Sequence, residues 1–371
     1  MRLSVLLPTH RTSLAACSRI AQICAWASPD IEVIVRDNSG DPKKRELLNL
    51  FRRDHCSIIF ADPCNQLTSY SETLRQATGD FVFFTADDDS FFDEAISAVP
   101  AVIERHVHDP GVVGFTGGYV TESRRGSSIM TYDKVDSDDP VTRVKAYLSA
   151  IGPSVLYYSP MRRDVVQRTF DFMNTMPFFF SFQDQLNCLV YVLNGKFVSM
   201  QRLLYIYSVG DWENAETAEK RDTALYTRAG FDPAINMLQW FLCGLEGAIL
   251  VRNADSLFPA LPSAQRQMVA DLWFSVMFLR FKNEVRQTFG SSFADAANKL
   301  RGKLLGTSGR VLFQDQLAEI CDFLALFSKD NARAYFVFWD GVLNRRPPES
   351  VGSGTPSAGS DPAAGLARKA G

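Results

Sequence analysis

The chain has 371 residues, of which 46% are hydrophobic and 22% are charged, and its formal net charge is −3. This composition is that of an ordinary globular protein with enough length for a large core. A charge so close to balance predicts no basic surface for a phosphate backbone, so we expect no nucleic-acid partner.

The first hundred residues alternate short apolar runs with helical patterns. The runs predict strands at 3–7, 31–36, 57–61 and 81–85, and helices at 13–26, 42–54, 66–77 and 91–105. Strands that are almost wholly apolar and alternate with helices are typical of a parallel sheet covered on both faces. We therefore predict an α/β fold.

The pattern becomes irregular after residue 110 and then turns helical. It predicts strands at 112–119, 129–132 and 197–207, an extended stretch at 152–159, and helices at 141–150, 161–173 and 184–193. Residues 217–343 read as nearly all helical. Residues 345–371 are rich in Pro, Gly, Ser and Ala, a composition that predicts disorder.

Seven cysteines are scattered along the chain, and none forms a C-x-x-C pair. This usage predicts reduced thiols rather than disulfides or a zinc site. The stretch nearest to a membrane span, residues 234–251, is interrupted by Glu246. We expect a cytoplasmic protein, with peripheral contact at the inner face of the membrane as the alternative.

Polar loops follow three of the predicted strands, at residues 8–11, 37–39 and 87–89. In parallel sheets, ligands bind beyond the carboxyl ends of the strands. Because these ends lie at one edge of the sheet, the three loops predict a binding site there.

The run Asp87-Asp88-Asp89 directly follows an apolar strand. Adjacent carboxylates repel each other, so their clustering favours a bound cation. In an extended segment Asp87 and Asp89 point to one side, and Mg²⁺ or Mn²⁺ prefers such oxygen ligands. The alternative is that the acids cap the helix at 91–105, although one Asp would serve that purpose.

Two further carboxylates each allow two interpretations. Asp37, in Asp-Asn-Ser-Gly, either forms a turn or accepts a hydrogen bond from a nucleobase or ribose. Asp184 either stabilises the first turn of a helix or acts as a general base on an acceptor hydroxyl. The chain contains no Walker A, G-x-G-x-x-G or G-x-S-x-G motif.

Four segments together resemble glycosyltransferase family two. They are Val-Leu-Leu-Pro-Thr-His at 5–10, the strand and turn at 31–39, the strand that leads into 87–89, and Gln183-Asp184 with Leu186 and Gly195-Lys196. The resemblance covers residues 1–210. The chain departs from the family at Arg36 and Ala86, where an acid is common, and at Gln183, where Glu is common.

The resemblance implies a GT-A fold, with a Rossmann-like, mostly parallel sheet and helices on both faces. Residues 1–215 would form the catalytic domain that binds a nucleotide sugar, residues 216–344 a helical region, and residues 345–371 a disordered tail. The implied reaction is an inverting transfer from a nucleotide diphosphate sugar, with UDP as the expected nucleotide. The acceptor would be a hydroxyl of a saccharide or glycoconjugate, as in polysaccharide biosynthesis.

The resemblance also assigns roles to individual residues. The donor would be bound by Pro8, Thr9, Asp37, Asp87 and Asp88. A divalent metal, Mn²⁺ or Mg²⁺, would be held by Asp87 and Asp89 of a D-x-D motif. Asp184 would be the catalytic base.

Two other functions remain as alternatives. The first is a phosphoryl-transfer enzyme of the haloacid dehalogenase type, but in that group the acids follow the first strand and a Thr stands where this chain has Phe91. The second is a protein that binds a nucleotide sugar without catalysis.

Overall fold

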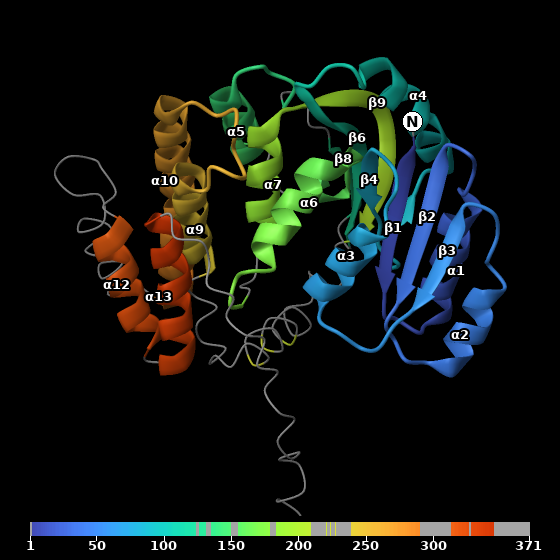
Figure 1. The fold of residues 1–371 in the computed structure, drawn as a ribbon, viewed down its shortest axis with the longest axis horizontal. Helices are drawn as coiled ribbons and strands as arrows, with labels where there is room; N and C mark the ends of the chain where they lie inside the picture. The colour runs from blue at the N-terminus through green and yellow to red at the C-terminus, as the bar shows by residue number, and fades with distance from the viewer. Residues whose placement is uncertain are drawn as a thin grey trace, which may run out of the picture.

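The computed structural model describes residues 2–123, 126–130, 135–149, 155–178, 183–208, 239–289, 313–325 and 328–344, together with residues 220, 223 and 227. The disordered tail expected at 345–371 and the domain boundary expected at 215 both lie outside these residues. Figure 1 shows a sheet of nine strands at one end of the molecule and a group of helices at the other.

The N-terminal half of the sheet is parallel, as the apolar runs predict. Strand β1 pairs with β2 on one side and β4 on the other, and β2 also pairs with β3. Their bounds are β1 Leu3–Thr9, β2 Ile31–Asp37, β3 Cys56–Phe60 and β4 Phe81–Phe84. All four residues of β4 are buried, which is expected of a strand covered on both faces.

The three helices that connect these strands begin where short polar side chains cap them, whereas the next helix along the chain has no side-chain cap. The side chains of Ser13, Asp41 and Asn65 each accept a hydrogen bond from a backbone N–H of the first turn. The helices are α1 Leu14–Ala25, α2 Pro42–Asn49, α3 Gln66–Arg75 and α4 Asp93–His106. Helix α2 is shorter than expected: it ends at Asn49, and the chain then turns toward β3, where His55 has a φ of +62°.

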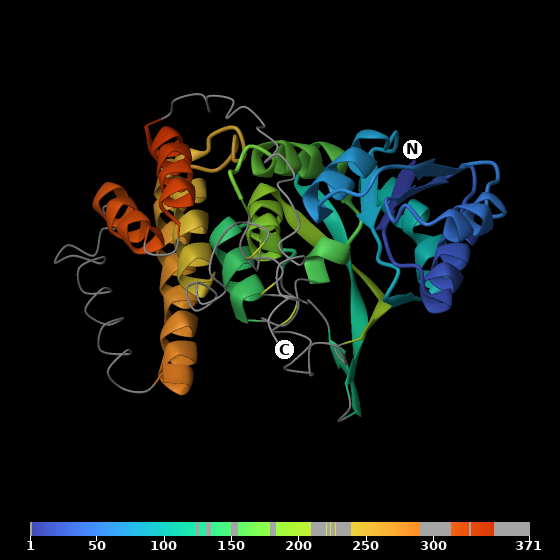
Figure 2. The ribbon, with the colours of Figure 1, turned by 90° about the horizontal axis from the view of Figure 1, so that it is seen from below.

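The second half of the sheet is mixed. The strand order is β3-β2-β1-β4-β8-β6-β9-β5, and β7 pairs with β6 outside this path. The added strands are β5 Ser90–Phe91, β6 Val112–Ser123, β7 Gly126–Met130, β8 Met161–Arg162 and β9 Lys196–Ser208. Strands β6 and β9 run parallel, whereas β8 is antiparallel to both of its neighbours. The β6–β7 hairpin projects beyond the body of the sheet (Figure 2).

Three local predictions are corrected by tertiary contacts. Met161 pairs with Val82 and Gly114, so the first two residues of the expected helix become β8, and α6 spans Arg163–Met173. Residues Val155–Tyr158 form a 3₁₀ helix rather than an extended stretch. The short strand β5 stands between the acidic run and α4 and includes Phe91, which was expected to begin that helix.

The helices of the second half pack side by side at the far end from β3 (Figure 1). They are α5 Pro140–Ser149, α7 Gln183–Asn194, α9 Gln239–Asn253, α10 Ser263–Phe289, α12 Phe313–Leu324 and α13 Lys329–Leu343. Helix α9 contacts α7, α10 and α13. Trp273 of α10 donates its indole N–H to the carbonyl oxygen of Cys243 of α9 at 2.9 Å, which joins the two helices. Among the residues described, no helix combines the length and apolar character needed to cross a membrane.

Candidate functional site

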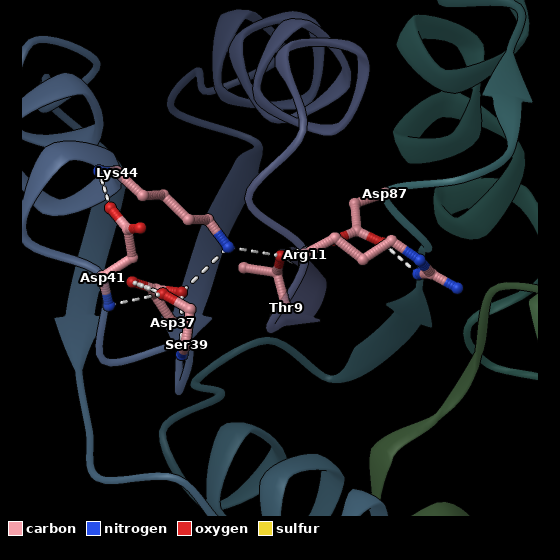
Figure 3. Close-up of polar contacts among 7 residues, drawn as sticks. All are labelled: Thr9, Arg11, Asp37, Ser39, Asp41, Lys44 and Asp87. Atoms are coloured by element: carbon pink, nitrogen blue, oxygen red, sulfur yellow. Dashed lines mark hydrogen bonds and ion pairs between the residues drawn. The ribbon is translucent and has the colours of Figure 1, made fainter.

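The carboxyl ends of β1, β2 and β4 bring the three predicted polar loops together. Thr9, the last residue of β1, stands opposite Asp37, the last residue of β2. Asp87 follows β4 and contacts Thr9 directly. Figure 3 shows these side chains joined in one polar network. The structure therefore places Thr9, Asp37 and Asp87 in a single site, whereas Pro8 is half-buried within β1 beside them.

Asp37 forms the turn that its sequence context predicts. Its carboxylate accepts hydrogen bonds from the backbone N–H of Ser39 at 3.2 Å and from the Ser39 hydroxyl at 3.1 Å. The same carboxylate forms an ion pair of 2.8 Å with the ammonium of Lys44. A carboxylate offers about four acceptor positions, so these three contacts leave Asp37 with capacity for one more.

Lys44 links the ends of β1 and β2 from helix α2. Its Nζ lies 2.8 Å from Asp37 Oδ1 and donates to Thr9 Oγ1 at 2.9 Å. The side chain is 1% exposed, so this is a buried ammonium. Asp41, the N-cap of α2, accepts from the backbone N–H of Lys44 at 2.8 Å and so fixes where the side chain begins.

Asp87 is held from two sides. The Thr9 hydroxyl donates to Oδ2 and the Arg11 guanidinium binds Oδ1. The second guanidinium nitrogen of Arg11 lies 2.5 Å from Asp88 Oδ2, so one arginine bridges two carboxylates. Burial lowers the pKa of Arg11, but Asp88 and Asp87 outweigh it, and the net effect is a pKa raised above its ordinary value.

The acidic run forms a bend rather than the expected extended segment, and Asp87 and Asp88 both contact Arg11, although the three side chains differ in exposure. Asp87 and Asp89 are 2% and 5% exposed, whereas the Asp88 side chain is 45% exposed. They do not cap the following helix, because α4 begins at Asp93 with Phe92 at its N-cap, and β5 intervenes. This excludes the capping interpretation of the acidic run. Within the part of the chain that the structure describes, no three acidic, His or Cys side chains converge into a ready-made metal cage.

The charge of the acidic run acts on two tyrosines. Burial raises the pKa of Tyr70 above its ordinary value, and the nearby carboxylates of Asp88 and Asp87 raise it further. Burial likewise raises the pKa of Tyr158, with Asp89 and Asp88 among the charges that add to the rise. Both hydroxyls therefore stay protonated.

Asp184 lies in the first turn of α7, and its Oδ1 accepts from the backbone N–H of Gln185 at 2.9 Å. Its carboxylate is one of the charges that raise the pKa of Tyr157, after burial itself. The Tyr157 ring stacks on Phe84 of β4 with 5.6 Å between ring centroids. Tyr157 therefore packs on the strand that leads into the acids, and the charge of Asp184 acts on the same tyrosine.

Sequence reasoning missed four residues of this site: Arg11, Lys44, Tyr70 and Tyr158. Arg11 carried a signal, because it is the one cation in the loop after β1 and that loop was expected to meet the acids. Lys44 sits in a charged run on α2 that resembles a solvated surface, and only the three-dimensional arrangement shows that its ammonium is buried. The tyrosines lie on elements whose packing the sequence pattern did not specify.

Comparison with known proteins agrees with this geometry. Residues 4–202, more than half of the chain, match the family described as Glycosyl transferase family 2. The chain belongs to this family. It is therefore a nucleotide-sugar glycosyltransferase, which decides against the phosphoryl-transfer alternative. No sequence among the curated proteins matches the chain.

Solved structures support the fold of this family member. The chain is similar to residues 1–349 of TarS from S. aureus, with 12% identity over 92% of this chain and 91% of that one, and a TM-score of 0.52. The TarS 1–349 complex with UDP-GlcNAc gives a TM-score of 0.51 at 14% identity, and it covers 94% of this chain and 93% of that one. At these identities the likeness establishes the GT-A glycosyltransferase fold.

Proposed function

We propose that this family member transfers a sugar from a UDP-linked donor to an acceptor hydroxyl, with inversion at the anomeric carbon. The observation that carries the proposal is the network that joins Asp37, Thr9 and Asp87 at the carboxyl edge of the sheet. The similar TarS structure in complex with UDP-GlcNAc supports the choice of a UDP sugar. The acceptor is proposed to be a saccharide or glycoconjugate, within polysaccharide biosynthesis.

The donor is assigned to the loops after β1 and β2. Asp37 retains one acceptor position, which fits a hydrogen bond from an N–H of the base or a hydroxyl of the ribose. Pro8 and Thr9 form the neighbouring strand end, and Asp88 presents the exposed carboxylate of the acidic run. These residues are placed to bind the nucleotide along one edge of the sheet.

The acidic run fits a divalent cation, Mn²⁺ or Mg²⁺, shared with the donor. Such ions are commonly bound through one or two carboxylates and the substrate's phosphates, so a protein cage of three ligands is not required. Asp87 and Asp89, the two buried acids of the run, are the proposed ligands. A bound cation would neutralise the charge that develops on the departing UDP.

Asp184 is proposed as the base that activates the acceptor. The acceptor oxygen forms a bond to the anomeric carbon while the bond from that carbon to the diphosphate breaks, and the hydroxyl proton passes to Asp184. The half-buried position of Asp184, on a different element from the acids, suits a group that approaches the face opposite the leaving group.

The test separates binding from transfer. UDP and UDP-GlcNAc should raise the melting temperature of the wild-type protein when Mn²⁺ is present, because a ligand that binds the native state stabilises it. Asp184→Asn should keep this shift but lose about 10²–10⁴-fold in UDP release with a panel of saccharide acceptors. Asp171→Asn, an exposed acid on α6, is the matched control and should behave as wild type.

Four results would count against the proposal. If no nucleotide shifts the melting temperature, UDP is not the donor nucleotide. If the shift is equally large without Mn²⁺, donor binding does not require the metal. Full turnover by Asp184→Asn would remove that residue from the mechanism. Nucleotide binding by a wild-type protein that never transfers would instead favour a binding protein without catalysis.

A further inference from the structure

Both oxygens of the Asp87 carboxylate are already engaged. Thr9 donates to Oδ2 and Arg11 binds Oδ1. A divalent cation that takes Asp87 as a ligand must therefore coexist with one of these contacts or replace it.

The contact from Thr9 is fixed by Lys44. An ammonium can only donate hydrogen bonds, so Thr9 Oγ1 must accept from Lys44 Nζ at 2.9 Å. The single proton of the Thr9 hydroxyl is then committed to Asp87. Because the Lys44 side chain is 1% exposed, a change in this arrangement would leave one donor of a buried ammonium without its acceptor.

The contact from Arg11 is of a different kind. The Arg11 side chain is 38% exposed, whereas that of Asp87 is 1% exposed, so the guanidinium covers the carboxylate from the solvent side. Its second contact is with Asp88, which is itself 45% exposed. Arg11 is therefore the partner of Asp87 that can move, and it stands on the side from which a cation would enter.

A guanidinium and a divalent cation repel each other when both contact the same carboxylate. We propose that Arg11 is a built-in counter-ion: it competes with the divalent cation for Asp87 and Asp88, and once displaced it pairs with the diphosphate of the donor. Guanidinium suits this exchange because it binds carboxylates and phosphates in the same forked geometry. This inference rests on the function proposed above and adds a role for Arg11 at the same site.

The decisive variant is Arg11→Gln, studied by calorimetry in two separate titrations. With Mn²⁺ alone, the Kd for the metal should fall at least about tenfold, because the competing charge is gone. With UDP at saturating Mn²⁺, the Kd for UDP should rise at least about tenfold, because a charged hydrogen-bonding partner of the diphosphate is lost. Changes of opposite sign are not expected from a residue that only supports the fold.

Two controls accompany the variant. Arg19→Gln removes an arginine of α1 whose guanidinium donates to Gln22 Oε1 at 3.4 Å, and it should leave both Kd values unchanged. Arg11→Lys keeps the charge and should bring the Mn²⁺ affinity back toward the wild-type value. Independently of any variant, a titration of the wild-type protein with Mg²⁺ should shift the Nε–H NMR resonance of Arg11 and not that of Arg19.

The outcomes distinguish this inference from the proposed function. An unchanged or weaker Mn²⁺ affinity in Arg11→Gln, or an unmoved Arg11 resonance, contradicts the proposal that Arg11 competes with the cation. Unchanged UDP affinity overturns the role toward the diphosphate. If the wild-type protein binds Mn²⁺ but neither UDP nor UDP-GlcNAc, the donor assignment fails while the competition between Arg11 and the cation still stands.

Discussion

At the scale of single residues, the site depends on a buried ion pair rather than on the acids alone. Asp37 and Lys44 have side chains that are 3% and 1% exposed, and each would be costly to bury without the other. Their pairing also orients Thr9, which in turn contacts Asp87. The geometry of the acidic end of the site is therefore set by a lysine on helix α2.

We predict that Lys44→Met destabilises the protein by about 3 kcal/mol, because it leaves the Asp37 carboxylate buried without its counter-charge. The free energy of unfolding, measured by urea titration, tests this. Lys43→Met changes the exposed neighbour on the same helix and should have little effect. The double variant Asp37→Asn/Lys44→Met should recover much of the loss, and equal stability of the single and double variants would contradict the ion-pair account.

At the scale of elements, the strands and helices up to β4 were predictable because propensity and burial agree there. The apolar runs became β1–β4, and Ser13, Asp41 and Asn65 cap the helices that follow the strands. Predictions failed where a neighbouring strand decided the conformation. Met161 belongs to the sheet because it pairs with Val82, and the local pattern of a two-residue segment cannot predict that pairing.

The residues of the site likewise divide into those that the sequence predicts and those that depend on tertiary packing. Thr9, Asp37 and Asp87 were predictable because the ends of parallel strands must meet at one edge, and the structure brings them together. Lys44 was not predictable, since its burial depends on how α2 packs. Asp184 was assigned by resemblance alone, and its role stays a prediction.

The placement of the acids also depends on the approach of β4 to β1. Gly79, just before β4, donates its N–H to Ser4 Oγ at 2.9 Å. A Cβ at this position would lie 2.5 Å from the carbonyl oxygen of Arg2 and 2.7 Å from Ser4 Oγ, closer than real Cβ atoms come. A side chain here would force the start of β4 away from β1.

We predict that Gly79→Ala destabilises the protein by about 2 kcal/mol, because a backbone carbonyl cannot yield the space. Gly341→Ala is the matched control: nothing lies within 4 Å of its Cβ position in helix α13. That variant should be neutral, or more stable by roughly 0.5–1 kcal/mol. Thermal unfolding of both variants measures the difference, and equal melting temperatures would show that the two strands can separate without strain.

At the scale of the whole molecule, the C-terminal helices share one continuous hydrophobic core with the sheet, and they contact the segment before α7. Glu246 of α9 is 1% exposed and accepts a hydrogen bond from the Tyr335 hydroxyl of α13 at 2.7 Å. The Tyr335 ring stacks on Phe178, ahead of helix α7, with 5.5 Å between ring centroids. Helix α13 therefore touches both the helical region and the segment that precedes Asp184.

Glu246 should make the stability of this region depend on pH. Burial raises the pKa of Glu246 from 4.5 to about 8, although the Tyr335 hydrogen bond opposes the rise. The folded state holds the proton of Glu246 more tightly than the unfolded state does. The contribution of Glu246 to the free energy of unfolding is therefore fully present below pH 4.5 and is lost as the pH rises to about 8. The loss should be on the order of a few kcal/mol.

We predict that Glu246→Gln removes this loss, because glutamine is neutral at every pH and still accepts the Tyr335 hydroxyl. The urea midpoint of the wild-type protein should fall between pH 5 and pH 8, and that of Glu246→Gln should fall less and lie higher at pH 8. Glu104→Gln, an exposed acid on α4, is the control and should follow the wild type. If Glu246→Gln shows the wild-type slope, then Glu246 is ionised in the folded protein at pH 5, and its pairing with Tyr335 is that of a buried carboxylate rather than a carboxylic acid.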